Sequence, residues 1–416
     1  MKLFTCVVLV SGLALVGAAC SSTNSGGSGT GGSGASATGG GGTGGFSGTG
    51  ATGGTGAGGT GGAAGSATGG AAGAPPCVGT QQPGEPYARS CVITKMSVDW
   101  KTHDRLGNGA DNWPVTWAQN GHQYTAWGDG WGFQSQGKPK ISLGVSRIEG
   151  SSAKGFNGFD VWLGDGQGSG KPNDGKSYGI LAIGADLYMW VSPGSGPAGY
   201  ADQRLWKSVD GGKSWSKASW SFAKSDGLIN PTFLQRGKGY AGAPDNYVYV
   251  YANHVKDSSA LTIQKPGEIA LLRVDKSKLM TRTAYQFYAG PTGGGSAAWT
   301  SKIGGRKPVF LDPKGVGWNT SASFNAPLGR YLLMTEHSQS FGGNLGVFDA
   351  PTPWGPWTTV SYQSGFGSPP TVPQNAFFWS FSNKWLSANG KSFVLVFTGI
   401  GNNDSWNTVH GTFTAQ

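Results

Sequence analysis

The sequence predicts an all-β fold, a five-bladed β-propeller, for its globular part. From residue 92 onward the chain is rich in Trp, Tyr, Gly and Thr and shows scarcely any helical periodicity. Short runs of strand-forming residues recur between clusters of Gly, Pro, Asn and Asp, a pattern typical of many short strands. Five of these runs resemble one another and recur along the chain, which indicates a repeat architecture.

Each of the five runs is followed, after a polar loop, by a second and shorter strand pattern. The first residues of the runs are separated by 63, 60, 84 and 62 positions, and a spacing near 60 leaves room for a four-stranded blade. We interpret the runs as the inner strands of the blades, and place the Gly-rich segment Gly293 to Gly295 in the wider third interval. A β-sandwich lectin explains the fivefold spacing less well. The runs are Tyr124–Asp129, Leu187–Ser192, Tyr247–Ala252, Tyr331–Glu336 and Phe393–Thr398.

Two turn motifs support the propeller. Ser208–Trp215 reads Ser-Val-Asp-Gly-Gly-Lys-Ser-Trp, an Asp-box of the kind that closes hairpins in many propellers. Its Asp210 is predicted to accept hydrogen bonds from backbone amides of the turn, a structural role. Phe348–Trp357 is predicted to be a second blade-closing turn.

The N-terminal residues predict export. Residues 1–20 combine Lys2, an apolar stretch too short to span a bilayer, and small residues before Cys20, as in a lipoprotein-type signal peptide. We expect Cys20 to be acylated, which predicts a lipoprotein of the outer membrane or cell surface. The alternative is ordinary cleavage nearby and secretion. The only membrane contact expected is the lipid anchor.

Residues 21–76 predict a flexible linker, because Gly, Ser, Thr and Ala dominate and no charged residue occurs. The propeller domain is predicted over residues 77–416. Cys77 and Cys91 flank its start, and in an exported protein a disulfide between them is the leading interpretation. No metal site is predicted, since these two thiols lack a zinc-site pattern.

Charge argues against nucleic acid as a partner. The formal net charge is +10, but charged residues make up 12% of the chain and no Lys/Arg run occurs. We predict a monomer that needs no cofactor, and a structural cation on the propeller axis stays open. Neither a serine-hydrolase elbow, a phosphate-binding loop nor an H-E-x-x-H motif is present.

Asp111 and Asp129 are the strongest candidates for chemistry. Both lie among tryptophans and glycines, and indole rings stack on the apolar faces of sugars. Apolar surroundings also raise the pKa of a carboxyl group, as a general acid requires. Glycosidic cleavage needs two carboxyl groups. The alternative is that each aspartate caps a turn. The neighbouring tryptophans predicted to contact a sugar are Trp113, Trp127 and Trp131.

Other candidates lie near the ends of the predicted inner strands. Asp404 follows the fifth run. Glu336 ends the fourth run beside His337, and both are predicted to bind substrate. Lys176 and Tyr178, which precede the second run, could donate hydrogen bonds to a substrate. A surface loop, and a histidine with a purely structural role, are the alternatives.

Residues 92–416 resemble the endo-D-arabinanases, five-bladed propeller glycoside hydrolases first catalogued as a domain of unknown function. Members of that family cleave the arabinofuranosyl chains of mycobacterial-type arabinogalactan and lipoarabinomannan. The resemblance implies an inverting mechanism in which Asp111 is the general base, Asp129 the general acid and Asp404 a supporting carboxylate. The segments that carry it are Asp111–Ala118, Tyr124–Gly130, Lys176–Ile180, Asn319–Ser323, Pro353–Trp357 and Asn403–Asp404.

The sequence therefore predicts an exported, endo-acting glycoside hydrolase whose partner is an arabinan-like polysaccharide. The rival hypothesis is a non-catalytic, glycan-binding propeller at the cell surface, since aromatic residues and a tether serve adhesion equally well. Sialidase chemistry, a third hypothesis, needs a cluster of arginines that the scattered arginines of this sequence do not provide.

Overall fold

The computed structural model describes residues 79–107, 109–133, 140–164, 175–192, 202–256, 262–367, 376–399 and 404–416. They belong to one compact unit, Gly69–Gln416. The described residues form β-strands and short 3-10 helices, and no helix among them is long and apolar enough to cross a membrane. The predicted signal peptide, Cys20, the linker and Cys77 lie outside the described residues, so these assignments stay predictions.

Five antiparallel blades follow one another along the chain, and a parallel pairing of β10 with β16 joins blades 3 and 4 into one sheet. Blades 1, 2 and 4 are meanders in sequence order, whereas β15 also pairs with β12 in blade 3 and the N-terminal β1 is the outermost strand of blade 5. Blade 1 contains β2 (Val115–Trp117), β3 (Gln123–Gly130), β4 (Ile141–Glu149) and β5 (Asn157–Trp162). Blade 2 contains β6 (Lys176–Ile183), β7 (Asp186–Ser192), β8 (Arg204–Ser208) and β9 (Ser216–Lys217). Blade 3 contains β10 (Leu228–Gln235), β11 (Tyr247–His254), β12 (Gly267–Asp275), β13 (Gln286–Gly293), β14 (Ser296–Thr300) and β15 (Pro308–Asp312).

Blade 4 contains β16 (Thr320–Asn325), β17 (Arg330–Glu336), β18 (Leu345–Ala350) and β19 (Thr358–Gln363). Blade 5 contains β20 (Ala376–Phe381), β21 (Ser392–Gly399) and β22 (Ser405–Ala415), with β1 (Ile93–Leu106) as its outermost strand. The 3-10 helices are η2 (Lys224–Asp226), η3 (Lys238–Tyr240), η4 (Arg282–Ala284), η5 (Ile303–Gly305) and η6 (Asn383–Trp385).

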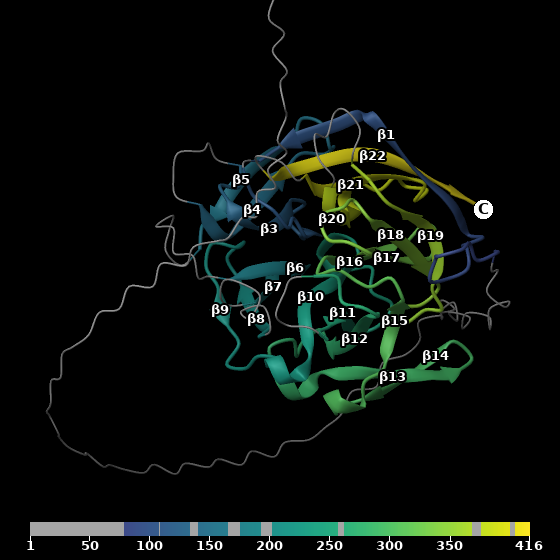
Figure 1. Cartoon of the computed structure of the whole chain (residues 1–416). Coiled ribbons are helices and arrows are strands. Elements are labelled where there is room, and N and C mark those ends of the chain that lie inside the picture. The colour runs from purple at the N-terminus through teal and green to yellow at the C-terminus, as the bar shows by residue number, and fades with distance from the viewer. Residues whose placement is uncertain are drawn as a thin grey trace, which may run out of the picture. The chain divides into compact units, whose positions relative to one another are not determined.

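The first strands of the blades contact one another, and this contact makes the five blades a propeller. β6 packs against β2 and β10, β10 against β16, and β16 against β20. β10 and β16 are parallel and pair at Leu234↔Ala322. The labels β6, β10, β16 and β20 gather at the centre of the sheets in Figure 1. The predicted all-β, five-bladed propeller is therefore confirmed.

The assignment of the inner strands was wrong by one strand. The five repeated runs form β3, β7, β11, β17 and β21, the second strand of each blade, and the innermost strands precede them. The second strand is paired on both sides and packed on both faces, so it reads as a continuous apolar run. The innermost strand is irregular: β6, β10 and β20 each have a register shift near their start.

The predicted turns are confirmed. Gly293–Gly295 forms the turn of the β13–β14 hairpin, and residues 351–357 connect β18 with β19. In the Asp-box, Asp210 Oδ1 accepts hydrogen bonds from the backbone N–H groups of Lys213 and Ser214, both 3.0 Å long. Hydrogen bonds from Ser214 are the main cause that lowers the pKa of Asp210 to about 2. Its role is structural.

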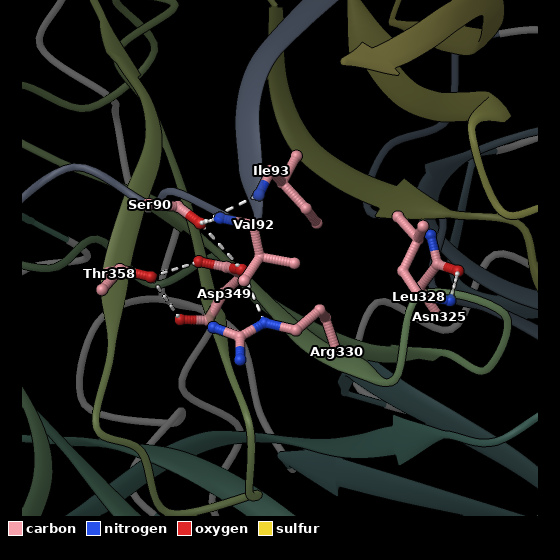
Figure 2. A network of polar contacts seen from close by, with 8 residues as sticks. All are labelled: Ser90, Val92, Ile93, Asn325, Leu328, Arg330, Asp349 and Thr358. Carbon is pink, nitrogen blue, oxygen red and sulfur yellow. Dashed lines mark hydrogen bonds and ion pairs between the residues drawn. The ribbon is translucent and has the colours of Figure 1, made fainter. Parts of the chain in front are cut away.

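Closure of the ring depends on the N-terminal segment. β1 pairs with β22, so the two ends of the domain share blade 5. Just before β1, Ser90 N donates to Thr359 O (2.9 Å) and fixes the segment to β19 of blade 4. Figure 2 shows how the buried carboxylate of Asp349 accepts hydrogen bonds from Ser90 Oγ (3.0 Å), Arg330 Nε (2.7 Å) and Thr358 Oγ1. This network holds the closing strand in place.

Close packing between blades 1 and 5 predicts a sensitive glycine. Trp113, Trp127 and Trp406 are fully buried in the cluster between these blades. A Cβ atom on Gly144 of β4 would lie 2.3 Å from Cζ2 of Trp127. Gly144→Ala is therefore expected to lower the free energy of unfolding by about 1–3 kcal/mol through overpacking. Urea denaturation measures this, and Gly304→Ala, at a position with open space around it, is the control. Equal stabilities for the two variants would contradict the packing described.

Candidate functional site

Four charged side chains meet where blades 1, 2 and 5 present the same end. Asp111 directly precedes β2, Asp129 lies near the end of β3, Lys176 begins β6, and Asp404 directly precedes β22. Because strands alternate in direction, the starts of inner strands and the ends of second strands lie at one end of the propeller. The pKa values of Asp111 and Asp404 show that these groups interact electrostatically. The three aspartates predicted from the sequence are therefore brought together.

Asp111 is held by backbone and side-chain hydrogen bonds. Its N–H donates to Gly128 O (2.9 Å), and its carbonyl oxygen accepts from Gly128 N (2.8 Å). Its Oδ1 accepts a hydrogen bond of 2.8 Å from Asn112 Nδ2. Burial raises the pKa of Asp111 well above its usual range, Lys176 opposes this effect, and the charges of Asp129 and Asp404 add to it. This environment favours the protonated form of Asp111.

Asp129 is the more exposed carboxylate, with 58% of its side chain accessible. Lys176 Nζ donates to its Oδ1 over 2.5 Å and also to Ser142 O over 2.7 Å. The Lys176 side chain is only 8% exposed, so its ammonium group reaches Asp129 from the protein interior. Asp129 has left-handed backbone (φ 49°), which turns its carboxylate out of the β3 ladder. The site thus contains one buried carboxyl group with a raised pKa and one exposed carboxylate in an ion pair.

Asp404 completes the group from blade 5. Burial raises its pKa to about 6, which Asp129 reinforces and Lys140 and Arg105 oppose. Lys140 lies with its Nζ 5.3 Å from the ring centre of Trp131, and Trp131 is partly exposed. Of the predicted tryptophans, Trp131 is thus the one with a partly exposed side chain beside these charged groups.

Two predicted tryptophans have another role. Trp113 and Trp127 are 0% exposed, which contradicts the prediction that they contact substrate directly. The Nε1 of Trp113 donates to Ala110 O (3.1 Å), and the Nε1 of Trp127 donates to Ser146 Oγ (2.7 Å). Their rings support the Asp111 segment from the interior.

Tyr178 forms part of an apolar floor at the axis. It is 1% exposed, and its ring packs against Trp318 and Phe378. Residues from the inner strands of blades 2, 3 and 5 and from the start of blade 4 meet in this cluster, namely Tyr178, Ile229, Trp318, Phe377 and Phe378. The predicted direct contact of Tyr178 with substrate is wrong in this structure, because the side chain is covered.

Glu336 and His337 lie inside blade 4. Glu336 is 0% exposed, its Oε1 accepts from Phe341 N (2.7 Å), and burial raises its pKa to about 8. His337 stacks on Tyr362 at 3.7 Å between ring centres, and burial lowers its pKa to about 4. Both are uncharged at neutral pH. Their burial contradicts the prediction that they bind substrate.

Four residues of the site were missed. Asn112 and Thr398 join blades 1 and 5, since Asn112 N donates to Thr398 Oγ1 (3.1 Å). Ser142 anchors Lys176 through its carbonyl oxygen. A Cβ on Gly128 would lie 2.9 Å from Lys176 Cδ and 3.0 Å from Asp111 Oδ1, so only glycine lets these groups approach. The Gly-Asp-Gly sequence around Asp129 was a signal for this close approach.

The described residues contain no group of three or more His, Cys, Asp or Glu side chains arranged to hold a metal ion. Cys91 lies just before β1, and its predicted bridge to Cys77 involves a residue outside the described ranges. That bridge therefore stays a prediction.

Residues 179–379 match the model of a family described as Domain of unknown function (DUF4185). The match begins after Asp111, Asp129 and Lys176 and ends before Asp404. No curated protein matches the chain.

Several solved structures are similar in part. One is a putative hydrolase from Bacteroides ovatus ATCC 8483, with 13% identity, a TM-score of 0.48, and coverage of 74% of this chain and 87% of that one. A second is a xylan β-1,4-xylosidase from Bacillus halodurans C-125, with 11% identity, a TM-score of 0.44 and coverage of 76% and 54%. A third is a GH43_1 enzyme from Xanthomonas citri, with 11% identity, a TM-score of 0.44 and coverage of 76% and 92%.

Proposed function

We propose that this protein is a glycoside hydrolase that cleaves an arabinofuranosyl polysaccharide internally, with Asp111 and Asp129 as its two reacting carboxyl groups. The observation that carries the proposal is the pair itself: one buried carboxyl group with a raised pKa, beside one exposed carboxylate paired with Lys176. Glycosidic hydrolysis requires one carboxyl group that gives a proton and one that activates water or attacks. The arabinan specificity rests on the family resemblance of the sequence.

The proposed reaction needs one of the two carboxyl groups protonated and the other ionised. The protonated carboxyl group donates its proton to the glycosidic oxygen as the C–O bond breaks. The ionised carboxylate takes a proton from water, whose oxygen forms the new bond at the anomeric carbon with inversion. Asp404, whose pKa is raised to about 6, adds negative charge that favours the positively charged transition state.

Two assignments of roles satisfy this chemistry. The family resemblance implies that Asp111 is the base and Asp129 the acid, whereas the raised pKa of Asp111 favours the reverse. An activated aryl glycoside distinguishes them, because its leaving group departs without a general acid. Of Asp111→Asn and Asp129→Asn, the variant that regains activity on the aryl glycoside is the one in which the general acid has been replaced.

Release of oligosaccharides from arabinogalactan and a panel of other polysaccharides tests the proposal. New reducing ends from arabinogalactan are expected. A glycan-binding propeller, the rival function, would retain the polysaccharide and release no product.

We also propose that Cys20 is acylated and anchors the protein at the cell surface. Metabolic labelling with a fatty-acid analogue, lost in Cys20→Ala, tests this anchor.

Lys176 is expected to set the pH dependence of the reaction. It is the charge that lowers the pKa of Asp111 most, so Lys176→Met should raise that pKa further. A higher pKa of Asp111 shifts to higher pH the limb of the pH–activity profile that Asp111 controls, whether Asp111 is the general acid or the general base. We expect the pH optimum of kcat/KM to rise by about one unit and kcat to fall, while Lys176→Arg retains the wild-type optimum. An unchanged optimum in Lys176→Met would show that Lys176 does not act on the pair.

A further inference from the structure

A fork between two strands of blade 3 accompanies a pocket away from the proposed catalytic pair. β12 pairs with β15 from Gly267 to Ala270 and with β13 at Leu272 and Arg273, so two strands share its outer edge. A pocket of about 210 Å³ lies here. Four of its seven lining residues carry ionisable side chains: His254, Glu268, Arg306 and Lys307. No part of the proposed function uses this pocket.

Arg306 has no ion-pair partner among the residues that the structure describes. It is half-buried, and its Nη1 donates to Ile303 O over 3.0 Å. Among the described residues, no carboxylate lies within 4.0 Å of it. Burial lowers the pKa of Arg306, and the more distant Asp226 and Glu268 oppose this effect. A guanidinium group offers five N–H donors in a planar fork that matches an oxyanion.

The carboxylate of Glu268 does not neutralise the charge of Arg306, because Glu268 already pairs with two other side chains. His254 Nδ1 lies 2.7 Å from Glu268 Oε2, and Lys256 Nζ lies 2.7 Å from Glu268 Oε1. Burial acts to raise the pKa of Glu268, but hydrogen bonds from Lys256 and His254 lower it below its usual value. The pair with Glu268 also fixes the His254 ring, so Nε2 is the nitrogen left for a ligand.

The free nitrogens of Arg306 and His254 converge over Gly227. A Cβ atom at Gly227 would lie 3.0 Å from Arg306 Nη2 and 3.3 Å from His254 Nε2. Gly227 ends η2 with left-handed backbone (φ 67°), and it has no side chain to fill the space between these nitrogens. Two nitrogens thus flank one small space, into which the oxygens of an oxyanion fit.

We propose that this pocket binds an oxyanion, either a tetrahedral phosphate or sulfate group or a carboxylate, through Arg306 and His254. Lys307, which is exposed at the rim, adds positive charge. The ligand is the acidic group of a glycan, recognised independently of the catalytic pair. The pocket lies on blade 3, whereas Asp111 and Asp129 belong to blade 1.

Isothermal titration of the full-length protein with sodium sulfate and, separately, with glucuronate tests this proposal at constant ionic strength. Binding of either probe is expected and identifies the preferred oxyanion, while neutral arabinose is the sugar control. Arg306→Met should weaken binding about tenfold or more, which corresponds to the loss of one charge-assisted contact. Lys302→Met removes the same charge from an exposed position outside the pocket and should leave affinity unchanged.

A second variant tests the geometry of the site without removing a charge. Gly227→Ala keeps every charge but fills the space between the two nitrogens, and its circular dichroism spectrum reports whether the fold survives. It should weaken binding as Arg306→Met does. The proposal is overturned if neither probe binds, if Arg306→Met and Lys302→Met weaken binding equally, or if a folded Gly227→Ala binds like wild type.

His254 gives a further readout. The charged groups around it are Glu268 on β12, Lys256 after β11 and Arg306 before β15. His254→Gln should weaken the binding of sulfate, and an unchanged affinity in this variant would exclude His254 from the site.

Discussion

Asp111→Asn is expected to lower oligosaccharide release from arabinogalactan by about 10²–10⁴-fold, the usual contribution of a general acid or base. Asparagine keeps the size of the side chain and its contact with Asn112 but can neither give nor take the proton. The loss should appear in kcat, because the carboxyl group acts in the transition state. Initial rates of reducing-end formation at saturating polysaccharide measure it.

Stability provides the control for this variant. The pKa of Asp111 is raised in the folded state, so the folded protein holds this proton more tightly than the unfolded chain does. Asp111 therefore costs stability as pH rises above the unfolded pKa, and Asp111→Asn should be at least as stable as wild type at neutral pH. Asp186→Asn removes a carboxylate at the start of β7, the opposite end of blade 2, and should keep full activity. Full activity in Asp111→Asn would remove this residue from the mechanism.

Arg330→Met is expected to lower the free energy of unfolding by about 3–5 kcal/mol, because it leaves a buried carboxylate without its cation. The side chain of Asp349 is 0% exposed, and that of Arg330 is 13% exposed. Asp349 also holds Ser90 and Thr358, as Figure 2 shows, so the network that fixes the closing segment should weaken as a whole. Urea denaturation followed by tryptophan fluorescence measures the loss.

Lys207→Met is the matched control for this network. Lys207 pairs with Asp186 at 2.7 Å, but both side chains are about one-third exposed. Solvent screens such a pair, and its loss is expected to cost about 0–1 kcal/mol. If Lys207→Met and Arg330→Met destabilise the protein equally, the Asp349 network does not hold the ring closed.

The sequence predicted the fold because five copies of one pattern recur along the chain. It did not distinguish the innermost strand from the second one. The second strands, such as β7 and β21, are apolar along most of their length, whereas β2 has three residues and β10 contains Asn230 and Pro231. Such irregular strands give no clean periodicity. The signal therefore came from the second strand of each blade.

The carboxyl pair could be predicted because few acidic residues occur near the predicted strand ends. The surrounding aromatic residues could not be assigned, because a tryptophan beside a catalytic aspartate has the same sequence pattern whether it faces solvent or the core. Trp131 is partly exposed, while Trp113 and Trp127 are buried between blades. Lys176 was predicted to donate hydrogen bonds to substrate, and its ion pair with Asp129 became visible only in three dimensions.

Digestion of arabinogalactan by wild type and by Asp129→Asn, side by side, tests the central claim most directly. Asp129 is exposed and asparagine keeps the size of its side chain, so the fold should be retained. Oligosaccharides released by wild type and absent with Asp129→Asn are the predicted result. Equal release by the two proteins would refute the site, and binding of the polysaccharide without release by either would show a glycan-binding propeller instead.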